Sequence, residues 1–413
     1  MISKVNRRGL IKWGLISAGV PVFSRVLSSP LLAQVGGRAQ EKLGYPATRE
    51  GMSGGGQLEI RMTTSPFTSD PDEFEAYQRI RPYNPESVYV EWARLAEKNE
   101  QMAEKFEGEK RMVTASEFYL RAAEFYRRAC VRQNEGEPRM VPTYKKYVGL
   151  FNKAWQLVPP PFERLQVSYE GKILDGYFRK PAGPAGRRFP VVIEQQGADT
   201  SAESSIMVGA SPYVARGMAY LVVDTPGTVG AMRLKDLHAP PDSERIAKIL
   251  VDYAVSRPDV DPSRIGMNGI SLGGYGGPRS ASGEKRIKAL WMMSGAYSLL
   301  EDIFDYYPPI RDRLRWIVGA RDFADARKKL ADFTLEGRAS KIECPMLIGY
   351  SNDDRIMDPR GASRLYQAAV NSKREMLEGL GHNVDANVGG PRTLPSAVVI
   401  QADWAAKHLV AGA

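Results

Sequence analysis

The spacing of apolar positions divides the chain into a helical first part and a second part in which strands alternate with helices. Between residues 85 and 158, apolar residues recur every three or four positions, which predicts three amphipathic helices. The middle helix is the most regular, with one apolar face at Phe118, Ala122, Phe125 and Ala129. Thr114 and Glu117 match a capping box at its start. Prolines at positions 159–161 stop the helical pattern and mark a boundary.

Beyond this boundary the period changes to that of strands. Alternating apolar and polar residues flank Glu170 and Gly171, which predicts a β-hairpin. Short apolar runs bounded by glycine or proline then predict buried strands, which begin at Pro190, Ala219, Arg264, Lys288 and Cys344. Helix-compatible stretches separate these runs. The sequence therefore predicts an α/β fold with a mostly parallel sheet covered by helices on both faces.

One serine lies between glycines at the end of the third of these runs. Gly269, Ile270, Ser271, Leu272 and Gly273 form a G-x-S-x-G motif, and a helix is expected to follow. Glycines two positions before and after the serine permit a sharp strand-to-helix turn that exposes the hydroxyl above the sheet. Ser271 is therefore the candidate nucleophile, and the Leu272 amide is a candidate oxyanion-hole donor.

A serine nucleophile needs a base, and the chain has three histidines. His382 lies in a loop after the last strand-like run and is the expected base. His408 lies in a terminal helical pattern and is expected to be an ordinary helix residue. His238 lies in a loop before the nucleophile and is the less favoured alternative.

The acid of a triad is expected between the serine and the histidine in the chain. Asp354 follows a strand-like run and precedes Arg355, Ile356 and Met357, and is the expected acid. Its neighbour Asp353 is the rival, and this choice stays open. Asp358 is expected to cap the next helix, ahead of a proline. The order serine, aspartate, histidine is that of α/β-hydrolase enzymes.

The second oxyanion donor is expected in the loop after the first central strand. There Gly197 permits a tight turn, and the Ala198 amide is the best candidate. Asp199 and Glu203 follow in the same segment, and we expect both to belong to a solvated loop.

Taken together, the segments "GISLGG", "SNDDRIM" and "GLGHN" resemble the α/β-hydrolase superfamily over residues 160–410. The helical segment before them is similar to the group that contains 2,6-dihydroxypseudooxynicotine hydrolase and the fermentation–respiration switch esterase-like proteins. The resemblance implies the α/β-hydrolase fold with an N-terminal helical cap.

The same resemblance implies Ser271 as nucleophile, Asp354 as acid and His382 as base. Members of this group cleave esters or a carbon–carbon bond of a β-diketone-like substrate. The carbon–carbon hydrolases also use a further acid, for which Glu301 or Asp302 lies in the right region. The sequence reading is thus a serine hydrolase, carboxylesterase-like, with carbon–carbon hydrolysis and a non-catalytic binding protein as alternatives.

The first residues of the chain are typical of an export signal. Arg7 and Arg8 precede an apolar stretch, and small residues allow cleavage after Ala33. This stretch is too short and too interrupted to span a bilayer. We expect recognition by the twin-arginine export machinery and a periplasmic or secreted protein.

These patterns predict four segments. They are a signal peptide at 1–33, a flexible leader at 34–66, a helical cap at 67–160 and a catalytic domain at 161–413.

Composition narrows the functional classes. Apolar residues make up 43% and charged residues 25% of the chain, as in ordinary globular proteins. Five basic residues of the expected signal peptide contribute to the net charge of +9, and the remaining charges are mixed in sign, so nucleic acid is not an expected partner.

Small-molecule chemistry without a cofactor is the remaining expectation. Cys130 and Cys344 lack the spacing of a metal site and are expected to be free thiols. No cofactor or metal is expected, the partner is a small-molecule substrate, and a homodimer is left open.

The cap is rich in aromatic residues, namely Trp92, Phe118, Tyr119, Phe125, Tyr126 and Trp155. They indicate an apolar or aromatic substrate of middle size, although packing against the sheet explains most of them.

Overall fold

The computed structural model describes residues 71–81, 84–131, 133, 135–382, 384–386 and 397–410. The expected signal peptide and leader lie outside these residues. Among the described helices, none is both long enough and apolar enough to cross a membrane.

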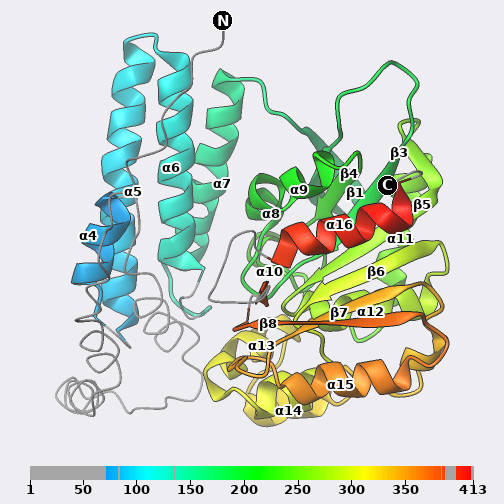
Figure 1. Ribbon diagram of the computed structural model, residues 1–413. Coiled ribbons are helices and arrows are strands. Elements are labelled where there is room, and N and C mark those ends of the chain that lie inside the picture. The colour runs from blue at the N-terminus through cyan, green and yellow to red at the C-terminus, as the bar shows by residue number, and fades with distance from the viewer. Residues whose placement is uncertain are drawn as a thin grey trace, which may run out of the picture. The chain divides into compact units, whose positions relative to one another are not determined.

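Helices form the first described part of the chain (Figure 1). They are α4 (Pro71–Arg79), α5 (Pro85–Gly108), α6 (Met112–Cys130) and α7 (Met140–Leu157). Asn84 caps α5 by accepting a hydrogen bond from the Ser87 amide, and Pro85 occupies the first turn, where its missing N–H costs nothing.

The start of α6 differs from the sequence prediction. The helix begins at Met112 after Arg111, so Thr114 lies inside it and forms no capping box. Arg111 makes no side-chain cap, and the Arg111 carbonyl accepts from the Ala115 amide. The first backbone hydrogen bond of the helix therefore already spans Thr114, so the Thr114 side chain cannot cap its start.

A nine-stranded sheet forms the second part of the described chain, in the order β1-β2-β4-β3-β5-β6-β7-β8-β9. The strands are β1 (Glu163–Tyr169), β2 (Lys172–Arg179), β3 (Phe189–Gln195), β4 (Ala219–Val223), β5 (Val260–Ile270), β6 (Ile287–Met293), β7 (Met346–Tyr350), β8 (Arg374–Leu380) and β9 (Asp385–Ala386). Pairing is parallel from β4 to β8 and antiparallel at β1, β2 and β9. The five predicted buried runs correspond to β3 to β7.

The predicted change from helices to strands and the predicted hairpin are both present. Helix α7 ends at Leu157 and β1 begins at Glu163, on either side of the three prolines. The turn from β1 to β2 has positive φ angles of 46° at Glu170 and 77° at Gly171. Two such residues make the tight turn that matches the twist of paired strands.

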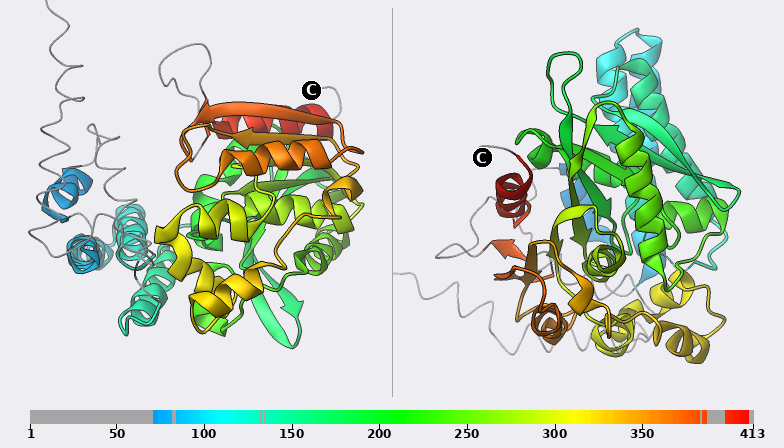
Figure 2. Two further views of the ribbon diagram at one scale, coloured as in Figure 1. Left: turned by 90° about the horizontal axis from the view of Figure 1, so that it is seen from below. Right: turned by 90° about the vertical axis from the view of Figure 1, so that its right-hand side faces the viewer.

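Helices cover both faces of the sheet (Figures 1 and 2). One face packs on α11 (Ser243–Ser256), α12 (Gly273–Gly283), α13 (Arg311–Ile317), α14 (Phe323–Leu330) and α15 (Pro359–Ala368). The other packs on α8 (Ala202–Val208), α9 (Ala210–Val214), α16 (Ala397–Leu409) and α7, whose Phe151 contacts Tyr177 of β2. Helices α4, α5 and α6 join the same cluster beyond α7 (Figure 1), and α10 (Val229–Lys235) contributes side chains to both clusters. Short helical turns lie at Leu300–Asp305, Pro308–Ile310 and Ala339–Lys341.

Alternation along the central strands explains this arrangement. On β3, Val191 and Ile193 belong to the core beneath α11 and α12, whereas Val192 belongs to the core shared with the cap. Successive side chains of a strand point to opposite faces, so a continuous apolar run requires cover on both.

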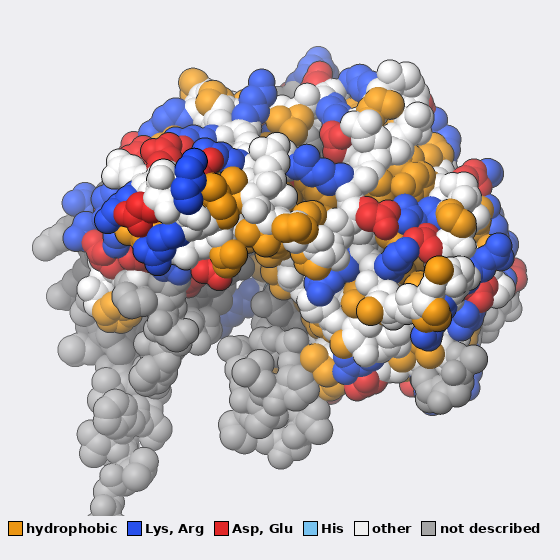
Figure 3. Space-filling model, turned by 90° about the horizontal axis from the view of Figure 1, so that it is seen from above, with side chains coloured by type: hydrophobic (Ala, Val, Ile, Leu, Met, Phe, Trp, Pro, Cys, Tyr) orange, Lys and Arg blue, Asp and Glu red, His pale blue; other side chains and the backbone are white. Residues whose placement is uncertain are grey.

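The described surface carries charges of both signs (Figure 3), and the two cysteines are not paired. On the face seen in Figure 3, basic and acidic side chains are interspersed. Cys130 and Cys344 are both free; Cys130 is buried and Cys344 is partly exposed. The described residues contain no group of histidine, cysteine or acidic side chains that would hold a metal.

Candidate active site

The turn at Ser271 is built as the G-x-S-x-G spacing predicts. Strand β5 ends at Ile270 and α12 begins at Gly273, and Ser271 has a φ of +53°. A Cβ atom on Gly269 would lie 2.2 Å from the Gly273 carbonyl oxygen, and one on Gly273 would lie 2.0 Å from that of Gln195. Only glycine fits at either position, because the backbone approaches too closely for a side chain.

The structure brings His382 to this serine. His382 lies directly after β8, and its Nε2 is 2.8 Å from Ser271 Oγ. Its Nδ1 is 2.9 Å from Asp354 Oδ2 and 3.2 Å from Asp354 Oδ1. These distances permit a proton to pass from the hydroxyl to the imidazole while the carboxylate holds the ring.

The structure separates the two neighbouring aspartates. The Asp354 carboxylate is buried, and its Oδ1 accepts hydrogen bonds from the amides of Ile356 at 2.8 Å and Met357 at 3.0 Å. Asp353 points elsewhere and accepts from the Gly381 amide at 2.7 Å. Asp354 therefore contacts the His382 imidazole, whereas Asp353 binds the backbone amide of Gly381, the residue before His382.

Asp358 caps a helix, as its position before a proline predicts. It precedes α15, and its carboxylate accepts a hydrogen bond from the Arg360 amide at 2.9 Å.

The other histidines lie away from this arrangement. The Nδ1 atom of His238 is 2.7 Å from the Trp316 carbonyl oxygen, and its Nε2 is 3.2 Å from Asp236. His408 belongs to α16 and packs on Trp404, with ring centroids 4.2 Å apart.

Ser294 belongs to the site but was missed by sequence reasoning. Its hydroxyl is 3.2 Å from Asp354 Oδ2 and 2.6 Å from the His382 carbonyl oxygen, and its φ is +62°. It follows β6, which lies between the strands that lead to Ser271 and Asp354. The signal that was available is this position, at the end of the strand between nucleophile and acid.

The two candidate oxyanion donors lie on segments that meet at the serine. A Cβ atom on Gly197 would lie 3.2 Å from Ser271 Cβ, so the loop that carries Ala198 packs against the nucleophile. Within the described residues, the Ala198 and Leu272 amides have no hydrogen-bond acceptor. Both amides are thus available to a ligand atom.

The two acids considered for carbon–carbon cleavage lie elsewhere. Both Glu301 and Asp302 pair with Arg364 on α15. Asp302 is buried and also accepts from the amides of Tyr297 and Ser298, at 2.6 and 2.9 Å. Neither acid has a hydrogen bond or ion pair with the serine, histidine or aspartate described above.

The expectation of a solvated loop is wrong for Glu203. This residue lies on α8, is only 4% exposed and accepts a hydrogen bond from the Tyr177 hydroxyl at 3.0 Å. Burial raises the pKa of its carboxyl. Asp199 lies near the buried Arg313, with 3.5 Å between Oδ1 and Nε. The capping box of Ser201 and Ser204 starts α8 at this point, and Ala202 and Ile206 of this helix are buried against the sheet.

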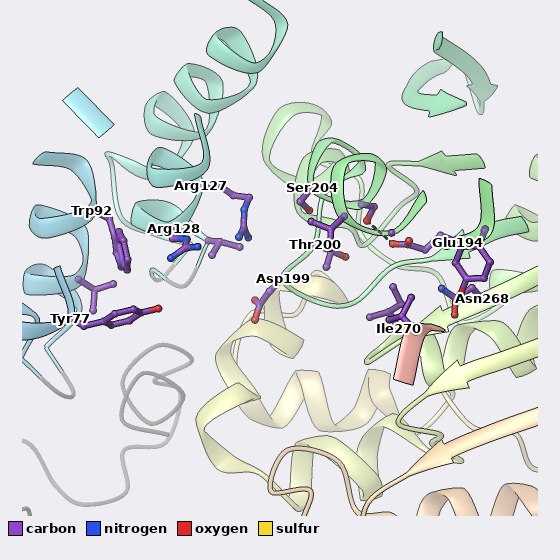
Figure 4. A pocket seen from close by; sticks show the side chains of 17 residues that line it. Tyr77, Trp92, Arg127, Arg128, Glu194, Asp199, Thr200, Ser204, Asn268 and Ile270 are labelled. Atoms are coloured by element: carbon purple, nitrogen blue, oxygen red, sulfur yellow. Dashed lines mark hydrogen bonds between the residues drawn. The ribbon is translucent and has the colours of Figure 1, made fainter. Parts of the chain in front are cut away.

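A cavity of about 390 Å³ lies between the cap and the sheet (Figure 4). Its cap side includes Tyr77, Trp92, Arg127 and Arg128, and its opposite side includes Glu194, Asp199, Thr200, Asn268 and Ile270. Most other cap aromatics, such as Tyr119 and Phe125, are buried in packing. A cavity of this size accommodates a small organic molecule.

A second cavity of about 70 Å³ adjoins the nucleophile on the other face of the sheet. Gly197 and Leu272 line it together with the apolar side chains of Ile246, Leu299 and Phe333.

Comparisons with known proteins place this architecture in context. No protein-family model matches the chain. The chain is 26% identical to hydrolase LUC6 of Fusarium sp over 324 residues, which covers 68% of this chain and 77% of that protein. It is 26% identical to the alpha/beta hydrolase psoB of Aspergillus fumigatus over 336 residues, which covers 69% of this chain and 75% of that protein. It is 27% identical to the 20-hydroxy-prefusarin hydrolase FUS2 of Gibberella moniliformis over 324 residues, which covers 68% of this chain and 77% of that protein.

Solved structures resemble the chain over most of its length. The crystal structure of 2,6-dihydroxy-pseudo-oxynicotine hydrolase matches with a TM-score of 0.70 at 23% identity, covering 86% of this chain and 96% of that one. The structure of AbyA5 matches with a TM-score of 0.62 at 17% identity, covering 80% of this chain and 88% of that one.

Proposed function

We propose that this chain, which belongs to the α/β-hydrolase superfamily and has its fold, is a serine hydrolase that cleaves esters through Ser271, His382 and Asp354. The observation that carries the proposal is the continuous hydrogen-bond path from Ser271 Oγ through the His382 ring to Asp354. A surface serine without a base is a poor nucleophile, and this path supplies one.

The geometry supports a two-step acyl transfer. His382 Nε2 takes the Ser271 proton as Oγ attacks the ester carbonyl, and the amides of Leu272 and Ala198 bind the resulting oxyanion. His382 then gives the proton to the departing alkoxide. In the second step the same imidazole takes a proton from water, whose oxygen attacks the acyl-enzyme. The bond to Ser271 Oγ then breaks, His382 returns the proton to that oxygen, and the carboxylic acid is released.

Carbon–carbon bond hydrolysis of a β-diketone is the alternative that the family resemblance implies. The structure supports ester cleavage better, because the acids considered for the alternative reaction, Glu301 and Asp302, are both paired with Arg364. A non-catalytic binding role is less well supported, since all three groups of the triad are present and in contact.

The cavities support a substrate of middle size. The small apolar cavity beside Leu272 has room for a short aliphatic group, and the larger cavity contains Trp92 and Tyr77. Several relatives named above are hydrolases, one of them of 20-hydroxy-prefusarin. We infer that the substrate is an apolar or aromatic ester.

Labelling with a fluorophosphonate probe tests the proposal. The wild-type protein is expected to react and Ser271→Ala to remain unlabelled while keeping its fold by circular dichroism. A folded wild-type protein that does not react would overturn the proposal. A parallel screen of p-nitrophenyl esters against β-diketones separates the two reactions.

Export is a separate proposal that rests on Arg7 and Arg8 at the start of the chain. We propose that the twin-arginine machinery carries the protein out of the cytoplasm. Fractionation of cells that express the wild type and a double Arg7→Lys, Arg8→Lys variant tests this. Equal amounts of mature protein outside the cytoplasm for both would contradict it.

A further inference from the structure

Two buried polar side chains at the sheet side of the 390 Å³ cavity take no part in the proposed mechanism. Glu194 on β3 and Asn268 on β5 are direct neighbours in the parallel pairing of these strands. They project on the same face of the sheet and are only 2% and 3% exposed. Both line the cavity, and Figure 4 shows them together at the end opposite Trp92.

Each of these side chains has a buried oxygen without a partner in the described part of the chain. The Oε1 atom of Glu194 accepts from the Ser205 hydroxyl at 2.5 Å, whereas its Oε2 has no hydrogen bond. The Oδ1 atom of Asn268 and the nearby hydroxyl of Tyr220 also have none. A buried polar group without a partner costs about 1–3 kcal/mol, so native proteins seldom retain one without a reason.

The backbone of Gly209 approaches two of these polar atoms closely. A Cβ atom there would lie 2.4 Å from the Tyr220 hydroxyl oxygen and 3.1 Å from Glu194 Oε2. Glu194 Oε2 and the Tyr220 hydroxyl therefore lie on the same side of Gly209. Because Glu194 and Asn268 are neighbours in the sheet and line the same cavity as Gly209, we expect one ligand group to reach both side chains.

The cavity also extends to the residue before the nucleophile, although Ser271 itself does not line it. Thr200 and Ile270 belong to its wall, and Ile270 immediately precedes Ser271. Ser271 Cβ and Thr200 Cγ2 lie 3.2 and 3.8 Å from the same point beside Gly197. A substrate whose carbonyl lies at Ser271 thus has this cavity within reach of its distal part.

A hydroxyl group fits the unpaired atoms best. Burial raises the pKa of Glu194 to about 7, and its bond to Ser205 opposes this only in part. Both protonation states are then populated near neutral pH, and a hydroxyl pairs with either because it donates and accepts. An ammonium group would bring three donors and a full charge into a buried site, which costs much more.

We propose that Glu194 and Asn268 bind a hydroxyl group on the distal part of the substrate, and that the substrate is therefore a hydroxylated aromatic ester. This rests on the proposed esterase function for the position of the scissile bond. The binding itself does not depend on catalysis. A site built to bond a hydroxyl rejects an analogue that lacks it far more strongly than an apolar pocket rejects an extra group.

Matched p-nitrophenyl esters test the preference. One series carries a terminal phenyl ring and the other a 4-hydroxyphenyl ring, with two to five methylene groups between ring and carbonyl. For at least one length, wild-type kcat/KM is expected to favour the hydroxylated ester by about 100-fold or more. Equal kcat/KM for both series at every length would overturn the proposal.

Variants assign the preference to the residues. Glu194→Met and Asn268→Leu keep the side-chain volume but remove the bonding groups, and each is expected to lower the preference at least tenfold. The Glu194→Gln side chain can still form a hydrogen bond with a hydroxyl, so this variant is expected to keep most of the preference for the hydroxylated ester. Glu203→Met is the matched control, because Glu203 is an equally buried acid outside this cavity. A preference unchanged in Glu194→Met and Asn268→Leu would contradict the assignment.

Binding to the Ser271→Ala protein separates this proposal from the esterase function. The probes are the N-methyl amides of the two acid series, and affinity is measured by calorimetry. Tighter binding of the hydroxylated amide, lost in the Ser271→Ala, Glu194→Met double variant, supports the site even if no ester is cleaved. Equal affinity for both amides, or no binding of either, would overturn it.

Discussion

At the scale of single residues, the candidate site rests on backbone positions that side chains rarely adopt. Ser271 and Ser294 have φ angles of +53° and +62°, and they follow the adjacent parallel strands β5 and β6. Non-glycine residues in this region cost about 1–3 kcal/mol and are concentrated at functional sites. The strain positions both hydroxyls at the same edge of the sheet, where His382 meets them.

Removal of the Ser294 hydroxyl is expected to impair catalysis without impairing binding. The hydroxyl contacts Asp354 and the His382 backbone, so its loss leaves the imidazole less well held. We expect kcat to fall by about 10-fold, as for one hydrogen bond to a charged group, with KM nearly unchanged. Steady-state kinetics of Ser294→Ala and Ser294→Gly check this.

The two Ser294 variants differ in a useful way. Glycine adopts the positive φ of this position without strain, whereas alanine does not. An equal loss of kcat in both variants would therefore assign the effect to the missing hydroxyl. A Ser294→Gly protein with wild-type kcat would show instead that the hydroxyl is dispensable.

Asparagine substitutions distinguish the adjacent aspartates. Asp354→Asn is expected to lower kcat by about 10⁴-fold, because an amide does not hold the imidazole in the tautomer that accepts the serine proton. Asp353→Asn keeps an oxygen acceptor for the Gly381 amide and is expected to lose less than about 10-fold. Kinetics with one p-nitrophenyl ester suffice, and the reverse order of effects would show that Asp353 is the acid.

At the scale of elements, one buried acid joins the cap to the sheet domain. Glu135 lies between α6 and α7, and Arg233 on α10 binds it through two hydrogen bonds of 2.7 and 3.0 Å. Arg313 on α13 pairs with the same carboxylate and donates to the Val131 carbonyl. The two arginine side chains are almost completely buried, at 0% and 1% exposure. The segment after α6 is therefore held by two elements of the sheet domain.

Glu135→Gln is expected to destabilise the protein strongly. Removing one partner from a buried ion pair leaves uncompensated charge and costs about 3–5 kcal/mol. Glu137→Gln is a suitable control, because Glu137 pairs with the partly exposed Arg139 and such pairs contribute at most about 1 kcal/mol. Urea unfolding measures both, and similar losses for the two variants would refute the role of Glu135.

At the scale of the whole molecule, buried acids make stability depend on pH. Burial raises the pKa of Glu194 from 4.5 to about 7 and also raises the pKa of Asp224, where Glu203 adds to the effect. A raised pKa means that the folded state holds the proton more tightly. The protonated Glu194 carboxyl therefore adds to the free energy of unfolding. This contribution is complete below pH 4.5 and is lost as the pH rises to about 7.

The free energy of unfolding is therefore expected to fall between pH 5 and pH 8, by about 3 kcal/mol for Glu194 at most. Glu194→Gln does not titrate, so its stability is expected to fall less over this range. Urea unfolding of both proteins at the two pH values measures the difference. Parallel curves for the wild type and the variant would contradict the raised pKa.

The sequence alone was sufficient for features that are local in the chain. The run of prolines, the Glu170–Gly171 turn and the G-x-S-x-G spacing each act through the backbone of a few residues. The buried runs likewise predicted a parallel sheet, because only cover on both faces allows apolar residues at every position. Ser271 and His382 were identified in this way, since three histidines left few choices.

Tertiary structure decided whatever depends on residues distant in the chain. Asp353 and Asp354 have the same chemistry and neighbouring positions, and only the packing of the loop shows which one faces His382. The place of Ser294 and the burial of Glu203 depend on which strands and helices become neighbours. Local patterns specify backbone conformation and apolar faces, whereas a contact between polar side chains exists only once the elements that carry them have packed.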